Sequence, residues 1–277
     1  MLKTPRRRCD TNLHGSVFIL ILLSLLLASC APTLSKVEFQ KRVAARCYNL
    51  RNHGVTSIDP LVTPNWRLSL KQVVASDPVK AAKILARLDS IHIRVILTSD
   101  SPITFTQVPD TLSVIDGVNY AGLMDGAKQA LYTFLHPWKS FMLDAPNPGY
   151  DTDFQLENRN DSEYLLSMQK PSPAVFTVSK DFIVKNTLVS VSGLTVTSYP
   201  HFTDTPEGLL LTRMESTYVY SNGQTSEVHL VADYQRIYGR EFLNRVHYSI
   251  PDLEMEFIFS DYQLFGTTII QNSSTSE

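Results

Sequence analysis

The feature that most constrains the fold of this chain is the alternation of apolar and polar residues through its second half. In the segment 253–264, Leu253, Met255, Phe257 and Phe259 fall on one side of a strand, while two glutamates and a serine fall on the other. Successive side chains of a strand point to opposite faces. The pattern therefore predicts an antiparallel sheet with one buried face and one solvated face.

Similar segments recur after Pro148, with turn signals at short intervals, and they predict a long antiparallel meander. The dipeptide Asn222-Gly223 predicts a type I′ hairpin turn, because this turn needs two residues with positive φ. The residues Pro200–Pro206 are expected to form a loop between strands. The predicted strands are Asp153–Glu157, Glu163–Gln169, Ala174–Val178, Phe182–Val191, Leu194–Tyr199, Leu209–Tyr220, Ser226–Tyr234, Arg245–Ile250 and Leu253–Leu264.

The first half of the chain predicts helices. The strongest pattern is Tyr120–Phe141, whose apolar residues recur at steps of three and four, and its wide apolar stripe must be buried. A helix is also expected over residues 37–48, and another after Asp77-Pro78, where an N-cap Asp precedes a first-turn Pro.

Shorter elements are expected around these helices. Ser69 opens a capping-box pattern and predicts the start of a short helix. Strands are predicted at His92–Leu97 and Ile103–Val108. The segment Asn49–Pro64 contains two prolines and a glycine, and it is predicted to be a loop.

Helices that precede a sheet with one apolar face predict the α+β class. We expect residues 37–271 to form a single α+β domain in which a curved antiparallel sheet wraps around helices, chiefly 120–142. The polar residues 272–277 are expected to be a disordered tail.

The N-terminus has the order of a secretory signal peptide. Four basic residues within the first eight positions precede the apolar run Val17–Leu27, which small residues follow. A membrane-spanning helix needs about 20 apolar residues, and this run is too short. We therefore expect residues 1–29 to be removed rather than retained as a span.

The junction Leu27-Ala28-Ser29-Cys30 resembles the lipobox of bacterial lipoproteins. In that family the cysteine thiol receives diacylglycerol, a peptidase cuts before the cysteine, and the new amino group is acylated. The resemblance implies cleavage between Ser29 and Cys30, and lipid attachment at Cys30. Two or three acyl chains anchor a protein stably, whereas a single chain binds only reversibly.

The residue after the lipidated cysteine bears on location. In Gram-negative lipoproteins an Asp there favours the inner membrane, so Ala31 implies the outer membrane, at its periplasmic face. Residues 30–36 would then be a lipidated tether. Removing 1–29 leaves 248 residues with a net charge of −5. This acidic body makes nucleic acid an unexpected partner, and the membrane is expected to be reached through the lipid anchor.

Several short motifs in the last third of the chain resemble the LolA/LolB-like superfamily of periplasmic lipoprotein carriers. The resemblance implies a half-open β-barrel in which helices form a lid over an apolar cavity for acyl chains. The N-terminal half differs from the carriers in carrying extra helices. The motifs are Gly208-Leu209-Leu210-Leu211, Asn222-Gly223, Ala232-Asp233-Tyr234-Gln235, Ile237-Tyr238-Gly239, Met255-Glu256-Phe257 and Ser260-Asp261-Tyr262.

Catalytic signatures and cofactor motifs are absent from the sequence. The histidines are isolated in sequence, so no metal site is expected. The nearest approach to a polar site is His201 with Asp204. Cys47 is interpreted as a small buried residue, with a reactive thiol as the alternative. We therefore expect a protein that is not an enzyme and needs no cofactor.

The helix 120–142 leaves two interpretations open. Its stripe is core, or part of it lines a cavity in which Leu131, Phe134 and Trp138 contact an acyl chain. Two functions follow from the whole chain. The first is a lipoprotein that binds or carries lipid or acylated cargo. The second is a structural or assembly lipoprotein that docks another protein of the cell envelope.

Overall fold

The computed structural model describes residues 34–99, 101–108, 114–115, 118–143, 153–170 and 172–266. The chain divides into two compact units, 1–38 and 39–277, and helix α2 (Lys36–Arg46) crosses the boundary. The predicted leader, the lipobox residues from Leu27 to Cys30, and the tail 272–277 lie outside the described residues. All the strands that the structure describes lie in the second unit.

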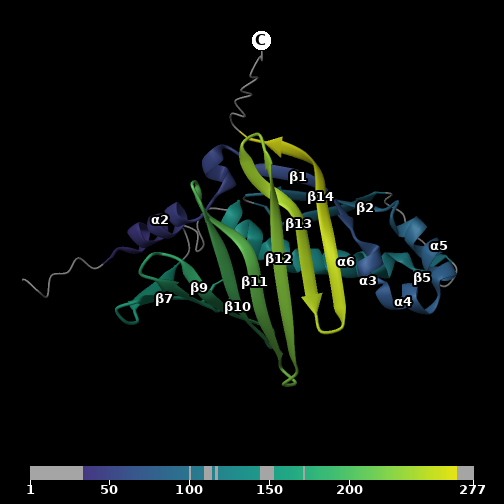
Figure 1. The fold of residues 1–277 in the computed structure, drawn as a ribbon. Coiled ribbons are helices and arrows are strands. Elements are labelled where there is room, and N and C mark those ends of the chain that lie inside the picture. The colour runs from purple at the N-terminus through teal and green to yellow at the C-terminus, as the bar shows by residue number, and fades with distance from the viewer. Residues whose placement is uncertain are drawn as a thin grey trace, which may run out of the picture. The chain divides into compact units, whose positions relative to one another are not determined.

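A single antiparallel sheet of twelve strands organises this unit (Figure 1). The end strands, β3 and β6, lie at opposite ends of the order, so the sheet is open. The predicted meander is therefore confirmed as a large antiparallel sheet. In spatial order the strands are β3 (Thr104–Val108), β2 (His92–Thr98), β1 (Ser57–Pro64), β14 (Leu253–Phe265), β13 (Arg240–Ile250), β12 (Thr225–Ile237), β11 (Gly208–Tyr220), β10 (Leu194–Thr205), β9 (Val184–Val191), β8 (Ala174–Ser179), β7 (Glu163–Met168) and β6 (Phe154–Asn158).

Strand β1 corrects the loop predicted over 49–64. It pairs with β14 on one side and β2 on the other, so it joins the first strands of the chain to the last. Its two prolines are residues typical of loops, so the sequence pattern did not indicate a strand. The register shifts between Asp59 and Leu61, so Pro60, which has no N–H, sits at the irregularity, and Pro64 is the last residue of the strand.

Strand β10 corrects the loop predicted at Pro200–Pro206. It runs without interruption to Thr205 and pairs with β11 along its length, with a register shift between His201 and Phe202. A bulge of this kind absorbs a residue without ending the strand.

The hairpin predicted at Asn222-Gly223 is present between β11 and β12, but it is not a type I′ turn. Among the four turn residues only Gly223 has a positive φ, of 81°. Positive φ at two successive residues occurs instead at Ser192-Gly193 and at Tyr238-Gly239. These pairs form the two-residue turns that match the twist of the flanking strands.

The helices follow the predictions with one change at a cap. Asp77 caps α5, since its Oδ1 accepts a hydrogen bond of 2.9 Å from the Lys80 N–H. Ser69 does not open a helix, because it ends α3 and Leu70 precedes α4. The remaining short elements include a two-stranded sheet of β4 (Val114–Ile115) and β5 (Val118–Asn119). The helices after α2 are the 3₁₀ helix η1 (Leu50–His53), α3 (Trp66–Ser69), α4 (Lys71–Ser76), α5 (Pro78–Leu88) and α6 (Tyr120–Met142).

Helix α6 lies against one face of the sheet, behind β10 to β14 in Figure 1. Its Tyr132 ring lies 6.4 Å from Phe105 of β3, and its Phe141 ring lies 5.4 Å from Phe202 of β10. The nine-residue step from Tyr132 to Phe141 rises about 14 Å along the helix axis. The seven strand-to-strand steps from β3 to β10 would span about 33 Å in a flat sheet, so a flat sheet could not reach both rings. These contacts are compatible with the predicted curvature of the sheet around α6.

The core lies between α6 and the sheet face it covers, which we call the inner face. Among the described residues, no helix is both long and apolar enough to cross a membrane. The buried residues that α6 contributes are Tyr120, Met124, Ala127, Ala130, Leu131, Phe134, Leu135, Trp138, Lys139, Phe141 and Met142.

Substitution by alanine should stabilise the protein at one glycine of α6 and not at the other. A Cβ at Gly126 would meet no atom within 4 Å, so Gly126→Ala should raise the free energy of unfolding by about 0.5–1 kcal/mol through helix propensity. A Cβ at Gly122 would lie 2.9 Å from the Asn119 side-chain amide, so Gly122→Ala should gain nothing. Urea unfolding of both variants checks this, and equal stabilisation would contradict it.

Candidate ligand-binding site

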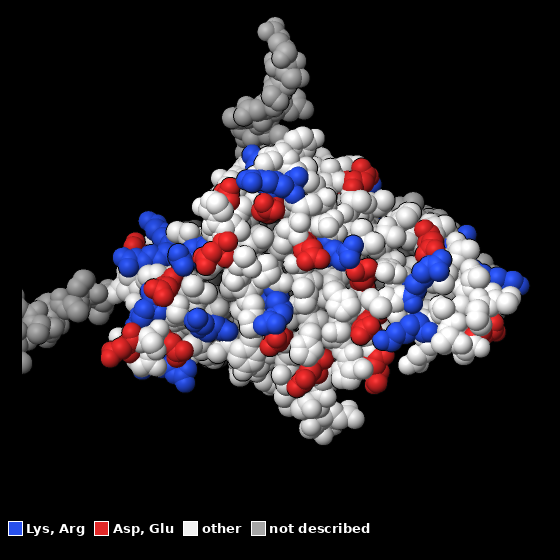
Figure 2. All heavy atoms as spheres, viewed as in Figure 1, with Lys and Arg blue, Asp and Glu red and all other residues white. Residues whose placement is uncertain are grey.

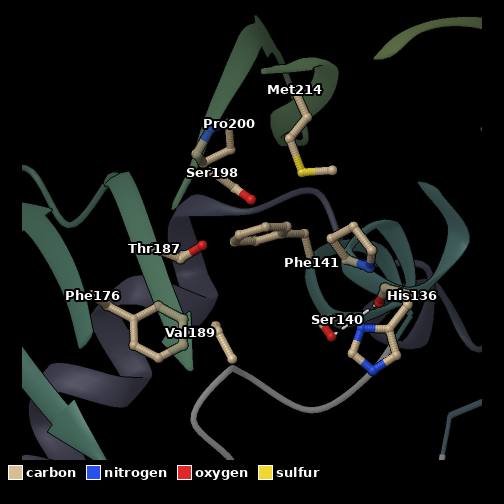
Figure 3. Close-up of a pocket in the computed structure, with 10 residues that line it drawn as sticks. His136, Ser140, Phe141, Phe176, Thr187, Val189, Ser198, Pro200 and Met214 are labelled. Atoms are coloured by element: carbon tan, nitrogen blue, oxygen red, sulfur yellow. Dashed lines mark hydrogen bonds between the residues drawn. The ribbon is translucent and has the colours of Figure 1, made fainter. Parts of the chain in front are cut away.

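A cavity of about 120 Å³ lies between the end of α6 and the inner face of β8 to β11. Its lining is mostly apolar. Figure 3 shows the Phe141 ring reaching from α6 toward the strands, with the hydroxyls of Thr187 and Ser198 facing it. The lining residues are His136, Pro137, Ser140 and Phe141 of α6, Phe176 of β8, Thr187 and Val189 of β9, Ser198 and Pro200 of β10, and Met214 of β11.

The strand register places the cavity residues on one face. Phe176, Thr187, Ser198 and Ser216 are successive cross-strand partners from β8 to β11, and directly paired residues share a face. The Oγ atoms of Ser198 and Ser216 lie 2.8 Å apart and are hydrogen-bonded to each other. The polar atoms of this row therefore lie beside apolar rings.

The end of α6 supplies the other wall. The helix continues for five residues beyond Pro137, to Met142, so the proline does not end it. The Ser140 hydroxyl donates to the His136 carbonyl oxygen at 3.2 Å. His136 and Ser140 also line a neighbouring hollow of about 270 Å³.

The inner face continues beyond the cavity as a half-exposed apolar strip, which we define as Val191, Leu194, Val196, Tyr218 and Tyr220. Val196 pairs with Tyr218, and Leu194 pairs with both Val191 and Tyr220. Val191 and Tyr220 are 46% and 44% exposed at the hairpin ends. The strip thus extends from the cavity toward solvent.

Tyr218 of the strip carries no charge at neutral pH. Burial, together with smaller contributions from the nearby hydroxyls of Tyr248 and Tyr220, raises the pKa of Tyr218 to about 12. Burial also raises the pKa of the Tyr248 hydroxyl. These phenols stay protonated, so they present hydrogen-bonding groups without charge.

The three residues expected to contact a ligand lie deeper than the cavity. Leu131, Phe134 and Trp138 are at most 1% exposed, and none of them lines the cavity. Trp138 Nε1 donates at 3.0 Å to the Tyr234 hydroxyl, which in turn donates to the Leu211 carbonyl oxygen. Their role as ligand contacts stays a prediction.

The other polar residues singled out from sequence do not assemble into a site. His201 Nε2 lies 3.8 Å from Glu215 on β11, while Asp204 lies three residues further along β10, opposite Leu209. The two glutamates on the solvated side of the last predicted strand, Glu254 and Glu256, form ion pairs with Lys71 and Arg245. No cluster of three or more metal-ligating side chains occurs in the part of the chain that the structure describes.

The outer face of the sheet is charged but mixed. Figure 2 shows the face opposite α6, where acidic and basic side chains are interspersed and neither sign gathers into a patch. Arg94 there bridges Asp59 at 3.6 Å and Asp261 at 3.0 Å across three neighbouring strands. This mixture of charges is typical of a solvent-exposed surface, and it does not create a potential of one sign that would attract a charged ligand.

The structure favours the inert interpretation of Cys47. Burial raises the pKa of its thiol to about 11, with a small opposing effect from the Arg46 charge. The thiolate is the nucleophilic form, and it is scarce at neutral pH when the pKa is raised.

Comparison of the chain with family models, curated proteins and solved structures gives no significant match. The resemblance to LolA/LolB-like carriers therefore stays a prediction.

The buried hydrogen bond from Trp138 to Tyr234 should couple α6 to the sheet. Tyr234→Phe removes the acceptor of the buried Trp138 N–H and the donor to the Leu211 carbonyl oxygen, so we expect a loss of about 2–3 kcal/mol in the free energy of unfolding. In a Trp138→Phe background this loss should shrink by about 1 kcal/mol. Urea unfolding measures the cycle, with the exposed Tyr238→Phe as a near-neutral control. Additive effects would show that the two residues are not coupled.

Cys47 should make stability depend on alkaline pH. Its pKa is about 11 in the folded chain against 9.0 as the reference. The thiol therefore loses its proton at a lower pH in the unfolded chain than in the folded chain. Its contribution to the free energy of unfolding is complete below about pH 9 and is lost as the pH rises toward 11. The unfolding free energy of the chain should fall more steeply over this range than that of Cys47→Ala. Parallel curves would contradict the assignment.

Proposed function

We propose that this chain is a lipid-anchored protein of the cell envelope that binds an acyl chain, free or attached to cargo, between α6 and the inner face of the sheet. The half-open, LolA/LolB-like barrel and the location at the periplasmic face of the outer membrane belong to this proposal. The observation that carries it is the cavity beside Phe141 and its continuation into the apolar strip.

The chemistry of the site supports an apolar ligand. Among the residues that the structure describes, neither the cavity lining nor the strip contains a Lys, Arg, Asp or Glu residue. Ligand sites for apolar molecules combine a mostly apolar lining with a few placed polar groups. The hydroxyls of Thr187 and Ser198 are such groups, and they are suited to the carbonyl or ester of an acyl head.

The size of the cavity determines how such a ligand would bind. A volume of about 120 Å³ is below the ~300–1,000 Å³ typical of ligand pockets. An acyl chain would therefore fill the cavity with one end and lie along the strip with the rest. The Phe141 ring stands at the centre of the cavity in Figure 3, so its rotation would enlarge the space.

The alternative is docking of another envelope protein on the sheet edges. The sheet is not closed, and β3 and β6 end it. Unpaired strand edges are templates for an added strand from a partner. A single stoichiometric partner with no bound lipid in native mass spectra would favour this function over lipid binding.

Matched valine substitutions test acyl binding. Val189 lines the cavity, whereas Val231 is exposed and pairs with Arg213 and His247 on the outer face. In protein lacking residues 1–30, Val189→Phe should weaken binding of a fluorescent fatty acid about tenfold, and Val231→Phe should leave it unchanged. The absence of saturable binding to the unmodified protein would overturn the proposal.

The anchor is tested separately at residue 30. Cys30→Ser removes the thiol that the lipid would occupy, so the variant should remain uncut and should leave the membrane fraction or stay there as precursor only. Gel mobility and membrane fractionation check this. Cleavage and membrane association identical to the parent chain would contradict lipidation at Cys30.

A further inference from the structure

A second hollow lies outside the acyl site, among α4, α5, β5 and the start of α6. Its volume is about 480 Å³, within the range typical of small-molecule pockets. Figure 1 shows these elements grouped beside α3. Its lining residues, none of which lines the first cavity, are Leu70, Val73, Lys80, Ile84, Val118, Asn119, Gly122 and Leu123.

The space of the hollow is left by a glycine at the start of α6 and by a short helix that is not buried. Gly122 has no side chain at the start of α6, and its N–H donates to the Asn119 side chain at 2.9 Å. Helix α4 contributes Val73 to the lining, yet none of its residues is buried. Apolar surface thus remains uncovered by the described residues around the hollow.

One positive charge lies in this apolar lining. Among the described residues that line the hollow, Lys80 is the only charged one, and none of the ion pairs of the described chain includes its ammonium. The nearest carboxylate in sequence on its helix, that of Asp77, caps the backbone of α5. The positive end of the 23-residue helix α6 adds to the same potential, since α6 begins at Tyr120 beside Asn119.

We propose that this hollow binds a single-chain amphiphile with a carboxylate head. The apolar chain lies against Val73, Ile84 and Leu123, and the carboxylate pairs with Lys80. A cationic head would meet the Lys80 charge, so the site discriminates by charge. The volume suits one small molecule, whereas a stable protein partner needs about 800 Å² of surface on each side.

Binding at Lys80 does not depend on binding at the acyl site. A protein that fails to bind lipid beside Phe141 still presents the hollow at Lys80, and the reverse also holds. The two sites are distinguished by the position at which a probe reacts.

Photocrosslinking in the full chain tests the proposal. The probes are dodecanoate with a diazirine at its terminal carbon and the same chain with a trimethylammonium head. Mass spectrometry of the peptides locates the labels. We expect the carboxylate probe to label residues 70–84 or 118–123 about threefold more than the cationic probe does, because Lys80 is exposed and an ion pair with an exposed ammonium contributes about this factor.

Matched lysine variants assign the head group. Lys80→Gln should lower labelling by dodecanoate about threefold, while Lys83→Gln, at another exposed position of α5, should leave it unchanged. Val73→Trp, with folding checked by circular dichroism, should abolish labelling by filling the hollow. Equal labelling by both probes, or insensitivity to Lys80→Gln, would overturn the proposal. Labels confined to β9 and β10 would overturn it while supporting the acyl site.

Discussion

Burial of the apolar stripe of α6 against the inner face of the sheet is the interaction on which the rest of the structure depends. The stripe supplies Leu131, Phe134 and Trp138, all essentially inaccessible to solvent. Burying one large apolar side chain contributes about 1.5–3 kcal/mol, so this helix accounts for much of the core. Because it contacts strands as far apart as β3 and β10, it also ties together parts of the sheet that share no hydrogen bonds.

Strand pairing provides the second constraint. The pairing of β1 with β14 brings the first strand of the chain beside the last, and it requires contacts between residues about two hundred positions apart. The register of this pairing determines which side chains line the inner face, because a one-residue slip would turn every inward side chain outward. The row from Phe176 to Ser216 and the strip that ends at Tyr220 exist only in the observed register.

Much of the fold could be predicted from local pattern, and the errors have local causes. Alternation at Leu253–Leu264 and the helical stripe of 120–142 identified their elements, since burial on one face leaves a period in the sequence. Pro60 concealed β1, where a register shift accommodates a residue without an N–H. Pro200 concealed the end of β10, where the strand extends beyond Ser198, its last partner on β9, and is paired only with β11. Asn222-Gly223 marked a hairpin but not its turn type.

The candidate site was less accessible to prediction. Phe141 belongs to the helical stripe, but Thr187, Val189, Ser198 and Met214 come from three strands whose alignment no local pattern encodes. Local periodicity and short motifs were enough to predict the antiparallel class, the main helix and the absence of a catalytic motif. Tertiary structure alone decided which apolar side chains fill the core and which border a hollow, since packing depends on contacts between residues distant in the chain.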